Sequence, residues 1–272
     1  MPRASGFVTT SVLAFLALSS CRSEPREIVL TSTTSTEDSG LFEVLIPAFQ
    51  SDYPQYRVRV IAVGSGEALR LAARGDADVV LSHSPRAEAE FMSAGRGESQ
   101  RKVMFNDFVV VGPNNRAARP CGDADVTLVL TCIAEMGVLF ISRGDDSGTH
   151  ARERDLWEAS DLRPGGEWYL EAGQGMGAVL MMASEKEAYT LSDRGTFLSL
   201  SDRLQLGVVS EGDPRLRNQY SVIVVREASN PDGARDFAEW IVSTAAQEII
   251  ANFGVKKFGR PLFSPNAESP RM

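Results

Sequence analysis

Hydrophobic and polar residues alternate along the first third of the chain in a pattern that predicts strands followed by helices. Residues 26–31 form a short apolar, β-branched run, and the segment that follows carries apolar residues at helical spacing. The residues on this helix face are Leu41, Val44, Leu45, Ala48 and Phe49. Pro47 lies inside the pattern and is expected to kink or end the helix, because it lacks a backbone N–H.

The same alternation continues through the next strand and helix. Residues 56–63 alternate as a strand, and residues 67–74 predict a helix that ends at Gly75. Residues 77–81 predict a third strand. Strands that alternate with helices at this spacing are typical of a parallel sheet with crossover helices, so the fold class is α/β.

Strands and helices alternate again in the second half of the chain, after a turn-forming segment at Pro113-Asn114-Asn115. Strands are predicted at 108–112, 138–142 and 220–225, and helices at 149–159, 179–184 and 234–252. The segment 113–115 could carry the chain from the first lobe into a second lobe. We therefore expect two α/β lobes with a ligand cleft between them.

The N-terminus has the pattern of an export signal. Arg3 precedes an apolar run that is too short to span a membrane comfortably but has the length of a signal peptide core. Residues 1–20 are predicted to be this signal, and the small residues before Cys21 resemble a bacterial lipobox. The resemblance implies that Cys21 is lipidated and that the protein is periplasmic and anchored to a membrane. Plain secretion with an unmodified Cys21 is the alternative.

Composition and charge limit the partners. The chain of 272 residues is 43% hydrophobic and 24% charged, as in ordinary globular proteins. A formal net charge of −8 argues against general binding to nucleic acid, and two histidines with three cysteines do not supply a usual zinc site. No metal or cofactor is predicted, and any anion must be bound by local groups. Nothing in the sequence indicates an obligate oligomer, so a monomer is expected.

Cys121 and Cys132 remain after Cys21 is assigned to the lipid anchor. In an oxidising compartment they are candidates for a disulfide that closes a surface loop. Two buried thiols are the alternative, and neither thiol has an evident catalytic partner.

Three segments place small hydroxyl residues or glycines between a strand and a helix. They are residues 31–36, 63–66 and 141–149. Backbone N–H groups and the positive end of a helix dipole point outward together at such junctions, which favours anion binding. Arg143 in the third segment adds a guanidinium that suits oxyanion oxygens. The pattern predicts a site for a small tetrahedral oxyanion.

Seven segments carry a family resemblance. They are STTSTEDSGLFEVLIPAF, VGSGEAL, GDADVVLSH, FNDFVVVGP, FISRGDDSGTHARE, WYLEAGQGMGA and YTLSDRGTF. In this order, between about residues 27 and 263, they resemble the tungstate-binding proteins of bacterial ABC importers. The resemblance implies a periplasmic-binding-protein fold of type II that closes around one tungstate and delivers it to an ABC permease. Within that fold we expect lobe 1 at 26–107 plus 223–263, lobe 2 at 108–222 and a C-terminal tail at 264–272.

The resemblance also implies which residues bind the anion. The matched positions are the hydroxyl cluster Thr33, Thr34 and Ser35, the second-loop donor Ser65, the cationic group Arg143, and the adjacent donors Ser147, Gly148 and Thr149. His83 could donate from a ring N–H, and the segment containing Gly175 and Met176 could add backbone donors at the start of a helix.

The chemistry of the anion separates some alternatives. Phosphate near neutral pH carries a proton and needs an acceptor, whereas tungstate, molybdate and sulfate need donors only. We interpret Asp145 as orienting Arg143 and Asp146 as exposed; a carboxylate against the anion would instead favour phosphate. Tungstate and molybdate are nearly the same size, and only the family resemblance selects tungstate.

Three other functions stay open: a molybdate- or phosphate-binding protein of the same fold, an oxyanion sensor without transport, and a serine hydrolase. The hydrolase would use Ser65 or Ser147 with His83 or His150 as the base, although no G-x-S-x-G motif is present.

Overall fold

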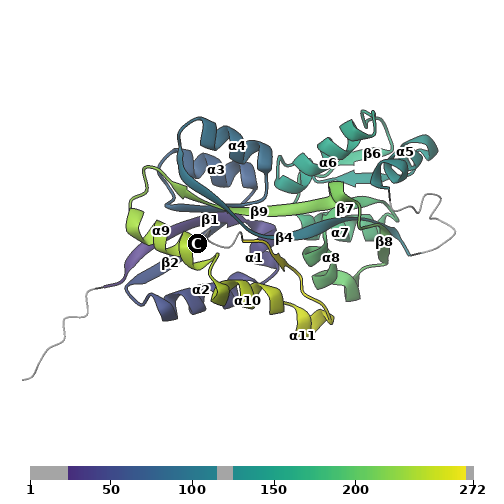
Figure 1. Cartoon of the computed structure of the whole chain (residues 1–272). Helices are drawn as coiled ribbons and strands as arrows, with labels where there is room; N and C mark the ends of the chain where they lie inside the picture. The colour runs from purple at the N-terminus through teal and green to yellow at the C-terminus, as the bar shows by residue number, and fades with distance from the viewer. Residues whose placement is uncertain (1–23, 115–124, 268–272) are drawn as a thin grey trace, which may run out of the picture.

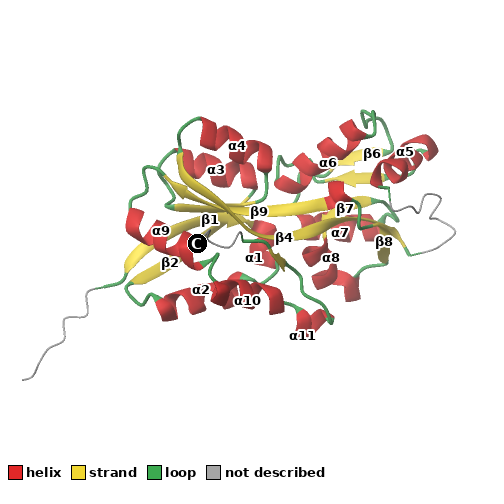
Figure 2. Ribbon diagram, viewed as in Figure 1, coloured by secondary structure: helices red, strands yellow, loops and turns green. Residues whose placement is uncertain are grey.

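The computed structural model describes residues 24–114 and 125–267 and shows two α/β lobes side by side (Figures 1 and 2). The predicted signal at 1–20, Cys21 and Cys121 lie outside the described residues. Cys132 is disulfide-bonded. Because Cys121 is not described, its pairing with Cys132 stays a prediction.

The first lobe is built mainly from the two ends of the chain. Its elements are β1 (Arg26–Thr33), α1 (Thr34–Asp38), α2 (Phe42–Asp52), β2 (Tyr56–Val63), α3 (Ser65–Ala73), β3 (Val79–Ser82), α4 (Pro85–Ser93), β9 (Arg217–Val225), α9 (Pro231–Trp240), α10 (Thr244–Asn252), α11 (Val255–Phe258) and β10 (Ser264–Pro265).

The second lobe is built from the middle of the chain. Its elements are α5 (Val126–Met136), β5 (Phe140–Ser142), α6 (Gly148–Ala159), β6 (Tyr169–Glu171), α7 (Met176–Glu185), β7 (Thr190–Asp193), α8 (Arg194–Leu200), η2 (Ser201–Arg203), β8 (Leu206–Ser210) and η3 (Pro214–Leu216). Strand β4 (Gly97–Pro113) belongs to both lobes.

The sheet of the first lobe has the strand order β10-β4-β9-β3-β1-β2. β1 lies parallel to β2 and β3, whereas β9 runs antiparallel between β3 and β4. The far half of β4 pairs with β7 and β8 in the second lobe, where Phe108 faces Asp193. Because β4 is continuous, it fixes the end of β7 close to the first lobe.

Each lobe has its own apolar core. Phe49 of α2 is fully buried and packs edge-on against Phe237 and Trp240 of α9. In the second lobe Trp157 of α6 is buried against Phe140 of β5. In residues 24–114 and 125–267, no helix combines the length and apolar character that crossing a bilayer requires.

The structure corrects three details of the predicted helices. Helix α2 continues past Pro47 to Asp52; Pro47 is exposed, so water can reach the backbone carbonyl that it leaves without a partner. Val44 is 40% exposed and does not share the buried face of that helix.

The predicted helix at 234–252 is divided into α9 and α10. Ser243 caps α10 by accepting a hydrogen bond from the backbone N–H of Ala246, which starts a new helix after the short break. Apolar periodicity continues across the break and concealed it in the sequence.

Strand β9 pairs with β4 from Arg217 to Val225, and β10 pairs with β4 at Ser264 and Pro265. Both segments therefore add to the sheet of the first lobe. The division of the chain at 107/108 and 222/223 remains a prediction.

Candidate functional site

All three predicted junctions join a strand to a helix. β1 leads directly into α1, β2 leads through Gly64 into α3, and β5 leads through the loop 143–147 into α6. Thr33 caps α1 and Ser147 caps α6 through their side-chain oxygens. The sequence pattern therefore located these turns correctly.

The hydroxyls of the first junction form one buried cluster. Thr33 Oγ1 lies 2.7 Å from Thr36 Oγ1 and 3.2 Å from Ser35 Oγ. Ser35 Oγ in turn lies 3.5 Å from Nε2 of His83, which follows β3. Thr34 is only half-buried. Ser35 and His83 thus lie together although 48 residues separate them.

The second and third junctions meet across the two lobes. A Cβ built on Gly148 would lie 2.6 Å from His83 Cε1 and 3.0 Å from Ser65 Oγ. A Cβ on Gly64 would lie 3.7 Å from Ser147 Cα. The backbone of α6 therefore touches the first lobe, and only a residue without a side chain fits at Gly148.

Several buried polar side-chain atoms have no hydrogen-bond partner among the described residues, and two of them, Ser65 Oγ and His83 Nδ1, lie at this contact. The atoms without such a partner are Ser65 Oγ, His83 Nδ1, Thr149 Oγ1, Asp193 Oδ2 and Thr196 Oγ1, with Asn106 Nδ2 and Ser210 Oγ. Buried polar groups are nearly always paired, and each exception requires an explanation. A polar ligand held between the lobes would supply partners to those of them that line the cleft.

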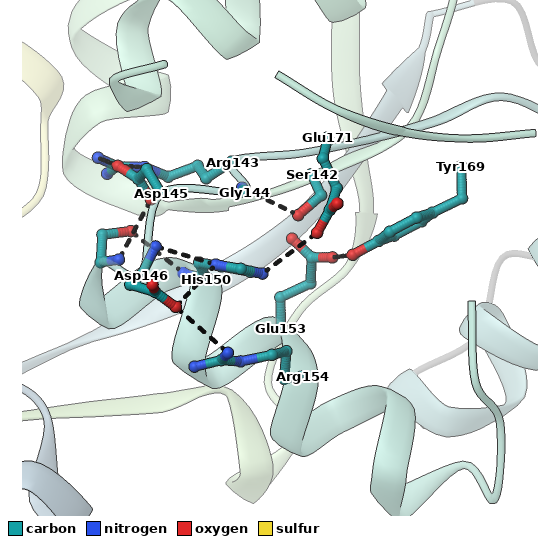
Figure 3. A network of polar contacts seen from close by, with 11 residues as sticks. Ser142, Arg143, Gly144, Asp145, Asp146, His150, Glu153, Arg154, Tyr169 and Glu171 are labelled. Atoms are coloured by element: carbon teal, nitrogen blue, oxygen red, sulfur yellow. Dashed lines mark hydrogen bonds and ion pairs between the residues drawn. The ribbon is translucent and has the colours of Figure 1, made fainter. Parts of the chain in front are cut away.

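Arg143 lies next to this region in the loop between β5 and α6 (Figure 3). Its side chain is 5% exposed, and Asp145 Oδ2 accepts hydrogen bonds from Nε at 3.1 Å and from Nη2 at 2.5 Å. Asp145 Oδ1 accepts from the backbone N–H of Ser147 at 3.2 Å. Asp145 therefore orients Arg143, as the sequence interpretation expected.

The charges in this loop agree with that arrangement. Burial alone would raise the pKa of Asp145, but the hydrogen bonds from Ser147 and the charge of Arg143 together lower it. Asp146 is 75% exposed and pairs with Arg154 at 3.3 Å. Asp146 was expected to be exposed, and this is confirmed.

A buried polar network supports the loop from below (Figure 3). Glu153 of α6 accepts hydrogen bonds from Tyr169 Oη at 2.6 Å and from Trp157 Nε1 at 3.2 Å. Gly144 has φ +61°, and a Cβ there would lie 2.8 Å from Glu171 Cβ. The loop is therefore held on both sides, which limits the positions that Arg143 can take.

His83 is neutral at neutral pH. Burial lowers the pKa of its imidazole to about 4, the charges of Arg143 and Arg152 act in the same direction, and a hydrogen bond with Asn218 opposes them. The ring lies 4.7 Å from that of Tyr220 on β9. A neutral imidazole can donate one N–H, and within residues 24–114 and 125–267 Nδ1 has no hydrogen-bond partner.

Asp193 is a further candidate for the site, and the sequence interpretation did not include it. It ends β7, is 2% exposed, and caps α8 because Oδ1 accepts a hydrogen bond from the backbone N–H of Thr196 at 2.9 Å. The charge of Arg143 opposes the rise that burial causes in the pKa of Asp193. The charge of Asp193 adds to the rise that burial causes in the pKa of Tyr220, whose hydroxyl bonds with Ser35 and Thr36. The signal was a fourth strand-to-helix junction, 190–196, with hydroxyl and glycine residues.

The segment at Gly175 and Met176 does not add side chains to this site. Gly175 caps α7 and is exposed, whereas the Met176 side chain is buried in the apolar core with Val179 and Leu180. Met176 has the helical spacing of a core residue, which explains its position.

The geometry argues against one of the pairings of the hydrolase alternative, that of Ser147 with His150. Ser147 Oγ accepts a hydrogen bond from the backbone N–H of His150, and the His150 ring accepts from the backbone N–H of Asp146 at 3.1 Å. The hydroxyl is therefore used as a helix cap rather than paired with the imidazole.

A cavity of 560 Å³ adjoins the contact between the lobes. Its lining includes His83 and Gly148, together with Arg86, Arg152 and Arg154 and the carboxylates of Glu90, Asp155 and Glu158. The described residues contain no group of His, Cys, Asp or Glu arranged to hold a metal ion.

Comparisons with known proteins agree with the fold and the order of the motifs. Residues 20–245 match the model of the PBP superfamily domain. The chain is 43% identical to the tungstate-binding protein TupA of Peptoclostridium acidaminophilum over 98% of this chain and 99% of that protein.

Two solved structures are also similar. The tungstate-binding protein TupA of Desulfovibrio alaskensis has 38% identity and a TM-score of 0.76, covering 89% of this chain and all of that one. The tungstate ABC transporter structure from Geobacter sulfurreducens has 40% identity and a TM-score of 0.76, covering 84% and 98%. These relatives are named as binding or transport proteins, not as enzymes.

We predict that His83 stays uncharged in the folded protein as the pH falls to about 4. The unfolded chain takes up this proton below about pH 6.5, so the free energy of unfolding should fall by roughly 3 kcal/mol between pH 6.5 and 4 through this residue. Urea denaturation of wild type and His83→Gln measures the difference, and NMR follows the ring. An imidazole that titrates near its ordinary pKa would contradict this prediction.

Proposed function

The chain belongs to the PBP superfamily and to the family of its tungstate-binding relatives, and we propose that it captures tungstate for an ABC permease. The observation that carries the proposal is the set of buried, unpartnered donors beside Arg143 at the contact between the lobes. Tungstate near neutral pH is a dianion that accepts hydrogen bonds and offers none, which matches such a set.

The donors come from both lobes. Ser65 and His83 belong to the first lobe, and Arg143 and Thr149 to the second. Because Asp145 and the buried network around Glu153 hold the guanidinium in place, little side-chain freedom is lost on binding. Thr33 and Ser35 extend the donor cluster in the first lobe, and Ser147 and Gly148 shape its opposite wall.

Phosphate is the second candidate ligand, and Asp193 is the observation that favours it. A buried carboxylate with one unpartnered oxygen could accept the proton that phosphate carries at neutral pH. Molybdate has the geometry and charge of tungstate, and only the names of the relatives favour tungstate over it.

Calorimetric titration of residues 22–272 with tungstate, molybdate, sulfate and phosphate tests the proposal. We expect tight tungstate binding with no response to sulfate or phosphate. Arg143→Ala should weaken tungstate binding by about a hundredfold or more, because a buried charged hydrogen-bond donor is removed.

The matched control is Arg154→Ala, which removes an exposed arginine of the same segment that pairs with Asp146. Unchanged affinity in Arg143→Ala would exclude the proposed site. Phosphate binding by the wild type would support the second candidate, and no response to any anion by a folded protein would exclude oxyanion capture.

Gly148→Ala should weaken tungstate binding by about ten- to a hundredfold, because the added methyl group would press on His83 and Ser65 when the lobes close. Because the same methyl group meets buried atoms of the first lobe, the unfolding midpoint should also fall, and affinity is measured at a temperature where circular dichroism shows the variant to be folded. The control is Gly165→Ala, where a Cβ meets no atom within 4 Å. Equal affinities in the two variants would show that closure does not bring these groups together.

We propose further that the protein is exported to the periplasm, acts as a monomer and is anchored by a lipid on Cys21. This part rests on the signal pattern of residues 1–20 and the small residues before Cys21.

In a bacterial host that expresses the full chain, wild type should incorporate labelled fatty acid and sediment with membranes. Cys21→Ser should lose both properties, whereas Cys132→Ser should retain the label. Fatty-acid incorporation by Cys21→Ser would show that Cys21 is not the lipidated residue.

A further inference from the structure

Asp193 uses one carboxylate oxygen within its own lobe, and its other oxygen is buried without a hydrogen-bond partner among the described residues. Oδ1 accepts from the backbone N–H of Thr196 at 2.9 Å and caps α8. Oδ2 is buried without a partner among the described residues, as is the neighbouring Thr196 Oγ1. A carboxyl group that is 2% exposed and half satisfied is costly unless a ligand or a proton completes it.

Charged and titratable groups on several elements lie near Asp193 or contact its neighbours Arg143 and Arg194. The charge of Arg143, in the β5–α6 loop, influences the pKa of Asp193, and the charge of Asp193 influences the pKa of Tyr220 on β9. Asp107 on β4 binds Arg194, which also binds Glu211 at 2.7 Å. Asp38 on α1 also lies within the field of Arg143.

The two arginines near Asp193 are already paired with other carboxylates. Asp145 accepts two hydrogen bonds from Arg143, and Asp107 accepts two from Arg194. His83 adds no charge at neutral pH, because burial lowers its pKa to about 4. An ionised Asp193 would thus face a bound dianion with little positive charge to separate them.

Like charges held close together cannot both remain ionised in a buried site. Burial already raises the pKa of the Asp193 carboxyl, although the hydrogen bond from the backbone N–H of Thr196 and the charge of Arg143 oppose the shift. A bound dianion adds repulsion in the same direction as burial. The group that can relieve this repulsion by taking a proton is Asp193 itself.

We propose that Asp193 is protonated when the anion is bound and donates its O–H to an oxygen of the anion. The proposal rests on the proposed function, since it takes tungstate as the ligand. The proton comes from solvent, stays on the carboxyl and is released when the lobes open. Binding of tungstate therefore takes up one proton.

This proton also makes Asp193 a specificity residue. With Oδ1 bound to Thr196 and Oδ2 carrying the proton, the carboxyl offers the site a donor. An anion that presents its own O–H at this position would leave two donors facing each other. The same side chain, if ionised, would accept that O–H and favour phosphate, so its protonation state decides which anion the site prefers.

Calorimetric titration of residues 22–272 with tungstate, in two buffers of different ionisation enthalpy, counts the protons taken up on binding. Wild type should take up close to one proton. Its affinity should fall by about tenfold per pH unit between roughly pH 7 and pH 9, where the proton must be taken from increasingly dilute solution.

Asp193→Asn supplies an N–H donor and an oxygen for the Thr196 cap without a titrating group. It should bind tungstate within about threefold of wild type near pH 7, take up no proton, and show no pH dependence from this residue. The control is Asp146→Asn, which changes an exposed aspartate of the neighbouring loop and should behave as wild type.

Two results would overturn the proposal. Tungstate binding by wild type without proton uptake at any pH would show that binding does not protonate Asp193. Loss of affinity in Asp193→Asn together with phosphate binding by wild type would show that the ionised carboxylate is the acceptor. If wild type bound no tungstate, the proposed function itself would be wrong. Tungstate binding without proton uptake would contradict only the proposal on Asp193.

Discussion

The pair formed by Arg143 and Asp145 is the interaction on which the rest of the site depends. A guanidinium that is 5% exposed needs a partner, because an unpaired buried charge is strongly destabilising. Asp145 supplies that partner and also accepts a hydrogen bond from the backbone N–H of Ser147, so the cation, the loop and the start of α6 are held as one unit. The buried carboxyl of Glu153 fixes the other side of this unit through Tyr169. A guanidinium held this firmly can bind an anion without changing its own position.

The continuous strand β4 gives the second constraint, because it carries one chain through both lobes. Phe108 on β4 faces Asp193 in the second lobe, while earlier residues of the same strand pair with β9 in the first. Tyr220 on β9 packs against His83 and is affected by the charge of Asp193. The polar groups of the two lobes are therefore connected through the strands that join the lobes.

The hydrophobic pattern predicted most strands, the alternation with helices and the three hydroxyl-rich junctions, because each of these is a local property. Asp193 was missed because an aspartate before a helix is usually only a cap, and its unpartnered oxygen is created by burial between distant segments. The Met176 side chain belongs to the core of the second lobe, and whether the backbone N–H groups at the start of α7 bind the anion stays a prediction. The break before Thr244 was hidden because apolar spacing continued across it. Local patterns thus located the strand-to-helix junctions, and tertiary contacts decide which of their side chains lie together.

Sharing the donors between the lobes couples capture to closure. An anion held only by Ser65 and His83 would contact the first lobe, and one held only by Arg143 and Thr149 would contact the second. The full set acts on one ligand only when the lobes approach as closely as Gly148 allows. With the proposed ligand, the anion would bind a closed form more tightly than an open one, and that difference in affinity would shift the population of conformations. A partner that recognises both lobes together would therefore distinguish the loaded protein from the empty one through the position of the lobes, without contacting the anion.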